Sequence, residues 1–108
     1  MKATDFGVIS TTMAQRDDAE RIAALLLSER LAACVQIMAI DSRYVWKGKT
    51  AHEAEFLLLI KTRSALFDTV TARIAAIHPY ETPEIVATPF AAGLPAYFAW
   101  IMENTNPA

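Results

Sequence analysis

The residues from His78 to Glu84 form the segment of this sequence best suited to chemistry. Within seven residues it holds an imidazole, a phenol and two carboxylates, those of His78, Tyr80, Glu81 and Glu84, and two prolines lie among them. Because proline fixes its own φ angle and biases the preceding residue toward extended geometry, we expect a rigid loop that presents its side chains. An imidazole beside two carboxylates is a mixed nitrogen and oxygen ligand set that suits copper or zinc.

Each of these side chains also has a structural interpretation. His78 follows a helical pattern, so its imidazole can cap a helix C-terminus, where the helix dipole favours a cation. The Tyr80 ring can pack against the sheet with its hydroxyl group satisfied. Glu81 and Glu84 can be solvated or paired, and they can also form an acid and base pair with a role in proton transfer.

The apolar periodicity predicts the elements that hold this loop. Helical spacing ends at Ile77, and a polar turn is expected at 11–15, with Arg30 at the negative end of the first helix. The order strand, helix, strand, strand, helix, strand predicts an α+β fold, a ferredoxin-like βαββαβ sandwich with both helices on one face of an antiparallel sheet. The expected ranges are strands at 6–10, 33–46, 50–61 and 84–88, and helices at 17–30, 64–77 and from Pro95 onward.

The two long strands are expected to form a hairpin that projects beyond the helices. Fourteen residues of strand at 33–46 would reach roughly 45 Å, and Gly48 marks the turn. The return strand is apolar on both faces at 56–60, so the projecting part predicts an oligomer. At the tip, Lys47 and Lys49 beside Trp46 either keep the hairpin soluble or bind an anion.

Composition excludes several classes of function. A single domain over 1–108 is expected, and a formal net charge of −2 without basic blocks argues against nucleic acid as a partner. The sequence has no apolar run of membrane-spanning length and no signal-like start, which predicts a cytoplasmic protein without a membrane partner. One cysteine and two histidines exclude a closed four-ligand zinc site, so no metal is expected to be required for folding.

Four motifs together resemble the CutA family, the divalent cation tolerance proteins. They are LAACV at 31–35, YVWKGK at 44–49, EFLLLIKT at 55–62 and HPYETPEI at 78–85. The resemblance implies a ferredoxin-like protomer in a PII-like homotrimer whose hairpins pair between subunits. It implies a non-enzymatic role in tolerance of, or response to, divalent metal ions such as copper through metal binding.

The resemblance also points to a copper site built from a cysteine at the end of the first strand and two adjacent histidines before the proline. The corresponding residues here are Ser10, Ile77 and His78. With only the second histidine present, copper and zinc are expected to bind more weakly than in members with all three ligands. The expected metal ligands are His78, Glu81 and Glu84.

Two other functions remain open at this point. One is a PII-like signalling trimer that binds an anionic small molecule in the intersubunit cleft against Trp46, Lys61 and Tyr80, with Lys61 also a charge partner for a carboxylate there. The other is an enzyme that uses His78 with Glu81 or Glu84 for proton transfer.

Overall fold

The order of the elements follows the predicted pattern. The computed structural model describes residues 1–107 of the chain. After a short 3₁₀ turn at Ala3–Asp5, and with a second one at Ser64–Leu66, the elements are β1 (Phe6–Met13), α1 (Arg16–Ser28), β2 (Cys34–Trp46), β3 (Lys49–Arg63), α2 (Phe67–Ile77), β4 (Ile85–Pro89) and α3 (Pro95–Asn104). The predicted α+β sandwich is therefore confirmed as a mixed fold with one four-stranded sheet.

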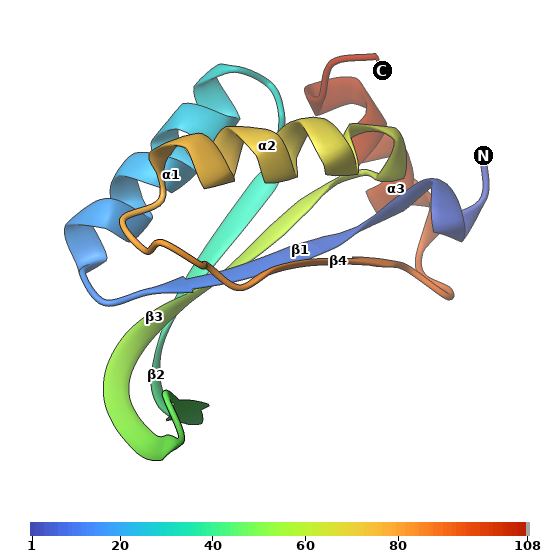
Figure 1. Cartoon of the computed structure of the whole chain (residues 1–108). Coiled ribbons are helices and arrows are strands. Elements are labelled where there is room, and N and C mark those ends of the chain that lie inside the picture. The colour runs from blue at the N-terminus through green and yellow to red at the C-terminus, as the bar shows by residue number, and fades with distance from the viewer. Residues whose placement is uncertain (108) are drawn as a thin grey trace.

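The sheet has the strand order β2-β3-β1-β4, and every neighbouring pair is antiparallel. Helices α1 and α2 lie side by side over one of its faces (Figure 1). Ile9 of β1 pairs with Ile60 of β3, and two residues along, Thr11 pairs with Leu58. These side chains are fully buried because strand alternation directs them toward the helices, where Ile22, Leu26, Val70 and Ile74 close the core.

Strands β2 and β3 continue past the helices as a long, curled hairpin, as predicted (Figure 1). Trp46 pairs with Lys49, so the turn contains only Lys47 and Gly48. Both turn residues have positive φ, 50° and 78°, which is the geometry of a two-residue type I′ turn. The glycine meets this requirement without steric cost.

Two predictions are wrong: the polar turn at 11–15 and the position of Arg30 at the negative end of the first helix. Strand β1 runs on through Met13, because Thr11, Thr12 and Met13 complete its pairing with β3, and threonine suits a strand. Helix α1 ends at Ser28, so Arg30 does not lie in its last turn. Arg30 instead takes a left-handed conformation after the helix and donates a 2.9 Å hydrogen bond to the carbonyl of Glu103 in α3.

Helix α3 closes the end of the sheet where β1 begins. Pro95 is its first residue, as predicted. The rings of Phe6 and Phe98 stack with their centroids 5.2 Å apart, and Ile101 is buried beside them. Among residues 1–107, no helix has the length and apolar character that a membrane crossing requires.

Candidate functional site

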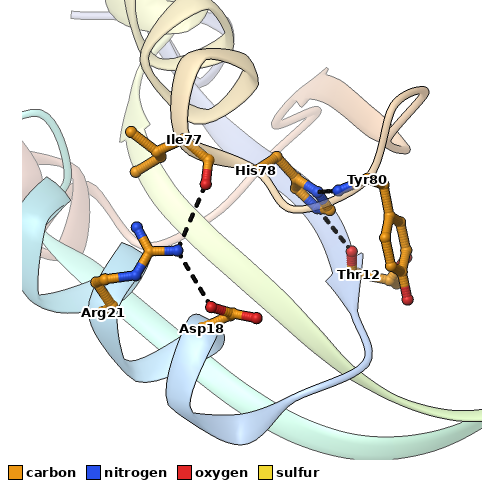
Figure 2. Close-up of polar contacts among 6 residues, drawn as sticks. All are labelled: Thr12, Asp18, Arg21, Ile77, His78 and Tyr80. Atoms are coloured by element: carbon orange, nitrogen blue, oxygen red, sulfur yellow. Dashed lines mark hydrogen bonds and ion pairs between the residues drawn. The ribbon is translucent and has the colours of Figure 1, made fainter.

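The loop that follows α2 is anchored to β1 through the ring of His78 (Figure 2). The Nε2 atom lies 2.8 Å from the carbonyl oxygen of Thr12, and the backbone N–H of Tyr80 donates a 3.0 Å hydrogen bond to Nδ1. Since a carbonyl only accepts and an amide N–H only donates, the neutral ring with its proton on Nε2 satisfies both contacts. Both ring nitrogens are thus engaged in holding the loop.

His78 caps helix α2 with its backbone, as the helix-cap interpretation predicted, but its imidazole ring does not take part in the cap. His78 is the C-cap residue of α2, and its backbone N–H bonds to Ile74 at 2.8 Å. The ring, however, bonds to β1 and not to the last carbonyls of the helix. The carbonyl of Ile77 is instead 3.4 Å from a guanidinium nitrogen of Arg21, which also pairs with Asp18 at 3.2 Å (Figure 2).

Tyr80 connects the same loop to the hairpin. Its hydroxyl group donates a 2.7 Å hydrogen bond to Oε2 of Glu55, a residue that is only 6% exposed. Burial of the phenol, followed by the bond to Glu55, raises the pKa of Tyr80 above its ordinary value. Tyr80 therefore remains a neutral donor to a carboxylate throughout the physiological pH range.

The curled hairpin and the loop enclose a groove of about 860 Å³. Tyr44 and Trp46 line it from β2, Glu53 and Glu55 from β3, and Tyr80 from the loop. Five acidic residues and Arg43 are among the residues that line the groove; the acidic ones are Asp41, Glu53, Glu55, Glu81 and Glu84. By strand register, Glu53 and Glu55 share a face of the hairpin with Tyr44 and Trp46, whereas Asp41 and Arg43 lie on the other face. The groove is thus strongly acidic, with aromatic walls.

The structure brings four of the six predicted site residues to this groove. Trp46, Tyr80, Glu81 and Glu84 line it, whereas His78 and Lys61 do not. Lys61 lies six residues from Glu55 along β3, about 20 Å away in an extended strand. Within the protomer, its ammonium group is 5.8 Å from the ring centroid of Tyr97 and has no carboxylate partner among residues 1–107.

The predicted ligands do not fit a preformed metal site in one protomer. Among the described residues, no three histidine, cysteine, aspartate or glutamate side chains come close enough together to hold one ion. His78 already uses both ring nitrogens, and Glu81 and Glu84 are exposed. Metal binding through these three residues stays a prediction.

Glu53, Glu55 and Tyr44 are not among the site residues predicted from the sequence. A signal was present, because Glu53 and Glu55 are two apart on a strand and so share a face just before an apolar run. Proximity to Glu53 raises the pKa of the Tyr44 phenol. The sequence does not show that the Tyr80 hydroxyl group bonds to Glu55, because the two residues are 25 positions apart along the chain.

The element order, the antiparallel sheet and the long hairpin with its acidic groove define a small α+β protein of the ferredoxin-like pattern. Residues 7–104 match the model of the CutA1 divalent ion tolerance protein family. The chain belongs to this family, as the resemblance in its motifs predicted.

Relatives from bacteria and plants support this membership. The divalent-cation tolerance protein CutA of Thermus thermophilus is 43% identical over 100 residues, which cover 92% of this chain and 97% of that protein. The chloroplastic CutA 1 protein of rice is 40% identical over 100 residues, again 92% of this chain. This alignment covers only 56% of the rice protein's length.

Solved structures of family members have the same fold. The Thermus thermophilus protein superposes with a TM-score of 0.89 at 42% identity, covering 94% of this chain and 99% of that one. Rice CutA1 gives a TM-score of 0.91 at 38% identity, covering 95% of each chain. The hairpin and the loop beside it therefore belong to a shared family architecture.

Proposed function

We propose that this protein contributes to tolerance of divalent metal ions as a non-enzymatic homotrimer that binds metal. Family membership supports the general role, because the matching family and the Thermus relative are named for divalent ion tolerance. Those names denote tolerance and not a reaction, which supports a non-catalytic role.

The apolar face of the sheet opposite α1 and α2 is the observation that supports the proposed homotrimer. Leu57 and Leu59 alternate with the buried Leu58 and Ile60 and so point to this other face, where they are half-buried. Met38 and Val86, on the same face by register, are 50% and 53% exposed. An apolar sheet face beside the long unpaired edge of β2 favours burial against other subunits. The number of subunits, three, is what the resemblance to the family implies.

Light scattering of the purified protein tests the assembly. The expected mass is three times that of the protomer at micromolar concentration. Replacing Leu59 by lysine places a charge in the proposed contact and should shift the mass toward the monomer, whereas a lysine at the exposed Ala24 of α1 should not. A wild-type protein that stays monomeric or forms a stable dimer contradicts the trimer.

For the metal, we assign His78 as the nitrogen ligand with Glu81 and Glu84 as oxygen ligands. The available lone pair of His78 is on Nδ1, which now accepts the N–H of Tyr80. Such a neutral hydrogen bond contributes only about 0.5–1.5 kcal/mol, so a copper or zinc ion can displace it. The loop must rearrange to bring the two exposed carboxylates to the ion, and binding should therefore be weak.

Calorimetric titration with copper and with zinc tests this assignment. Wild-type protein should bind in the range of tens of micromolar or weaker, and His78→Ala should abolish the binding. His52→Ala is the matched control, because His52 is the only other histidine and lies on the exposed hairpin. Tight binding that survives His78→Ala would place the ligands elsewhere.

The PII-like alternative is not favoured. It required an anionic ligand against Trp46, Lys61 and Tyr80, yet the groove that contains Trp46 and Tyr80 is lined by carboxylates, and Lys61 is not part of it. A cytoplasmic location remains a proposal, to be tested by cell fractionation. The rice relative is named chloroplastic and the Archaeoglobus fulgidus structure periplasmic, so location varies among family members.

A further inference from the structure

We propose that the loop at 78–84 sets the direction in which the β2–β3 hairpin leaves the sheet, and that the bond between Tyr80 and Glu55 thereby controls the contact of this hairpin with a second copy of the chain. This inference rests on the homotrimer proposed above and deepens it, because it names the residues that orient the subunit contact. We call residues 40–55, the part of the hairpin that is concerned, the arm.

The arm begins where β3 loses its second neighbour in the sheet. The last pair between β1 and β3 is Met13 with Phe56, whereas β2 and β3 stay paired from Ile40 with Glu55 to Trp46 with Lys49. Within the described residues the arm is therefore a two-stranded ribbon, and such a ribbon is only marginally stable in water by itself. Its direction must be fixed by contacts outside the sheet.

Such contacts lie on both faces of β3 at the base of the arm. On the face opposite the helices, the Tyr80 hydroxyl group donates its 2.7 Å hydrogen bond to Glu55, which is buried. On the helix side, the guanidinium of Arg16 lies 4.8 Å from the ring centroid of Phe56, the residue next to Glu55. Among residues 1–107, no other side-chain hydrogen bond or ion pair joins the arm to the rest of the protomer.

The loop is firm enough to direct the arm. His78 fixes it to Thr12, which lies in β1 beside the point where the arm begins, and the N–H of Tyr80 bonds to the same imidazole ring. Pro79 and Pro83 restrict the backbone on either side of Tyr80. Tyr80 therefore connects the end of β1 to the base of the arm through a segment with little freedom.

The arm continues the proposed subunit contact. By register, Tyr44 and Trp46 share the sheet face of Leu57 and Leu59, and Trp46 is 54% exposed in the protomer. Aromatic side chains that extend an apolar contact face favour a second copy of the chain as their partner. Whether they meet that copy depends on the direction of the arm, and so on the bond between Tyr80 and Glu55.

The same loop carries two of the proposed metal ligands, Glu81 and Glu84. A change that moves the loop and breaks the bond between Tyr80 and Glu55 would release the arm and weaken the subunit contact. Tyr80 is thus a positioning residue for assembly, and the loop connects the proposed site to the oligomer.

Subunit exchange between unlabelled and ¹⁵N-labelled protein, followed by native mass spectrometry, tests the proposal. The temperature is chosen so that wild-type subunits exchange slowly but measurably. Tyr80→Phe removes only the donor and should exchange about tenfold faster or more, as expected for the loss of one charge-assisted hydrogen bond. Glu55→Gln keeps a neutral acceptor and should have a smaller effect. The double variant should exchange no faster than Tyr80→Phe, because both substitutions act on one bond.

Hydrogen exchange shows where the effect lies. In Tyr80→Phe the amides of 41–54 should exchange faster than in the wild type, whereas those of 57–62, between β1 and β2, should keep their wild-type rates. Arg73→Gln is the control, because it removes two hydrogen bonds to Glu29 from the helix layer, on the other side of the sheet from the proposed contact. It should change neither the subunit exchange nor the arm.

Two exchange results would overturn the proposal. Equal acceleration in Tyr80→Phe and Arg73→Gln would mean that general destabilisation sets the rate. A wild-type rate in Tyr80→Phe would mean that the subunit contact directs the arm without the loop, and the homotrimer would stand. A wild-type protein that light scattering shows to be monomeric would overturn the homotrimer itself, and this inference with it.

Discussion

The hydroxyl group of Tyr80 and the Oε2 atom of Glu55, 2.7 Å apart, join the loop after α2 to the hairpin. This is a charge-assisted hydrogen bond in which a neutral phenol meets a buried carboxylate, and such bonds are stronger than neutral ones. It fixes one end of the acidic groove. The loop is fastened at a second point by His78, whose ring bonds to Thr12 of β1.

We expect Tyr80→Phe to destabilise the protein by about 1.5–3 kcal/mol. The substitution keeps the ring but removes the donor to a charged acceptor, and Glu55 is left buried without a partner. Chemical denaturation at fixed protein concentration measures the change. Tyr97→Phe is the control, because the Tyr97 hydroxyl group makes no hydrogen bond within residues 1–107; equal losses in the two variants would contradict the argument.

Tyr80 also predicts a loss of stability at alkaline pH. Its pKa is raised in the folded protein, whereas an unfolded tyrosine has a pKa of about 10. Below pH 10 the phenol is protonated in both states and its contribution is fully present. Above pH 10 the unfolded chain releases the proton first, so stability falls by up to about 1.4 kcal/mol per pH unit. Denaturation midpoints between pH 8 and 11 should show a shallower alkaline decline for Tyr80→Phe than for Tyr97→Phe.

The elements were predictable from sequence where the local pattern was strong. Apolar spacing, Gly48 and Pro95 placed the helices, the hairpin and the last helix within a few residues of their true ends. The prediction failed at Thr11 and Thr12, whose polar character suggests a turn. Their strand conformation depends on pairing with Leu58 and Leu57, a contact between distant segments that a local pattern does not contain.

The candidate site was predictable only in part, for the same reason. Trp46, Tyr80 and Glu84 were identified because their own segments carry unusual residues. Glu55 was not, since its importance comes from burial under Tyr80 and from the curl of the hairpin over the loop. Lys61 and Trp46 were predicted to line the same cleft because both belong to the motifs of the hairpin. Most of the length of β3 lies between them, since Trp46 is at the hairpin tip and Lys61 is near the other end of the strand.

Gly7→Ala should be strongly destabilising, by about 3 kcal/mol or more. A methyl group on Gly7 would collide with the carbonyl oxygen of Thr88 and would lie 2.9 Å from Cα of Pro89, so backbone atoms of β4 would have to move. Gly48→Ala is the matched control. Gly48 has a φ of 78°, but a methyl group added there would have no neighbouring atom within 4 Å. The substitution should therefore cost only about 1 kcal/mol of backbone strain. Thermal denaturation compares the two, and similar losses would contradict the close packing of β1 on β4.

Arg63→Lys should loosen the C-terminal end of α3. The guanidinium of Arg63 donates to the Thr105 hydroxyl at 2.8 Å, to the Thr105 carbonyl at 3.1 Å and to the carbonyl of Met102. The Thr105 hydroxyl in turn donates to the carbonyl of Ile101 at 2.8 Å, so one planar group caps the end of the helix. Lysine keeps the charge but cannot reproduce this fork of donors.

The expected cost of Arg63→Lys is roughly 2 kcal/mol, with faster hydrogen exchange at the amides of α3 than at those of α1. Arg43→Lys is the control, because Arg43 is exposed and its guanidinium makes no hydrogen bond or ion pair within residues 1–107, so this substitution should change stability by no more than about 0.5 kcal/mol. If α3 exchanges at the wild-type rate in Arg63→Lys, the helix is held by the stacking of Phe98 on Phe6 and not by its cap.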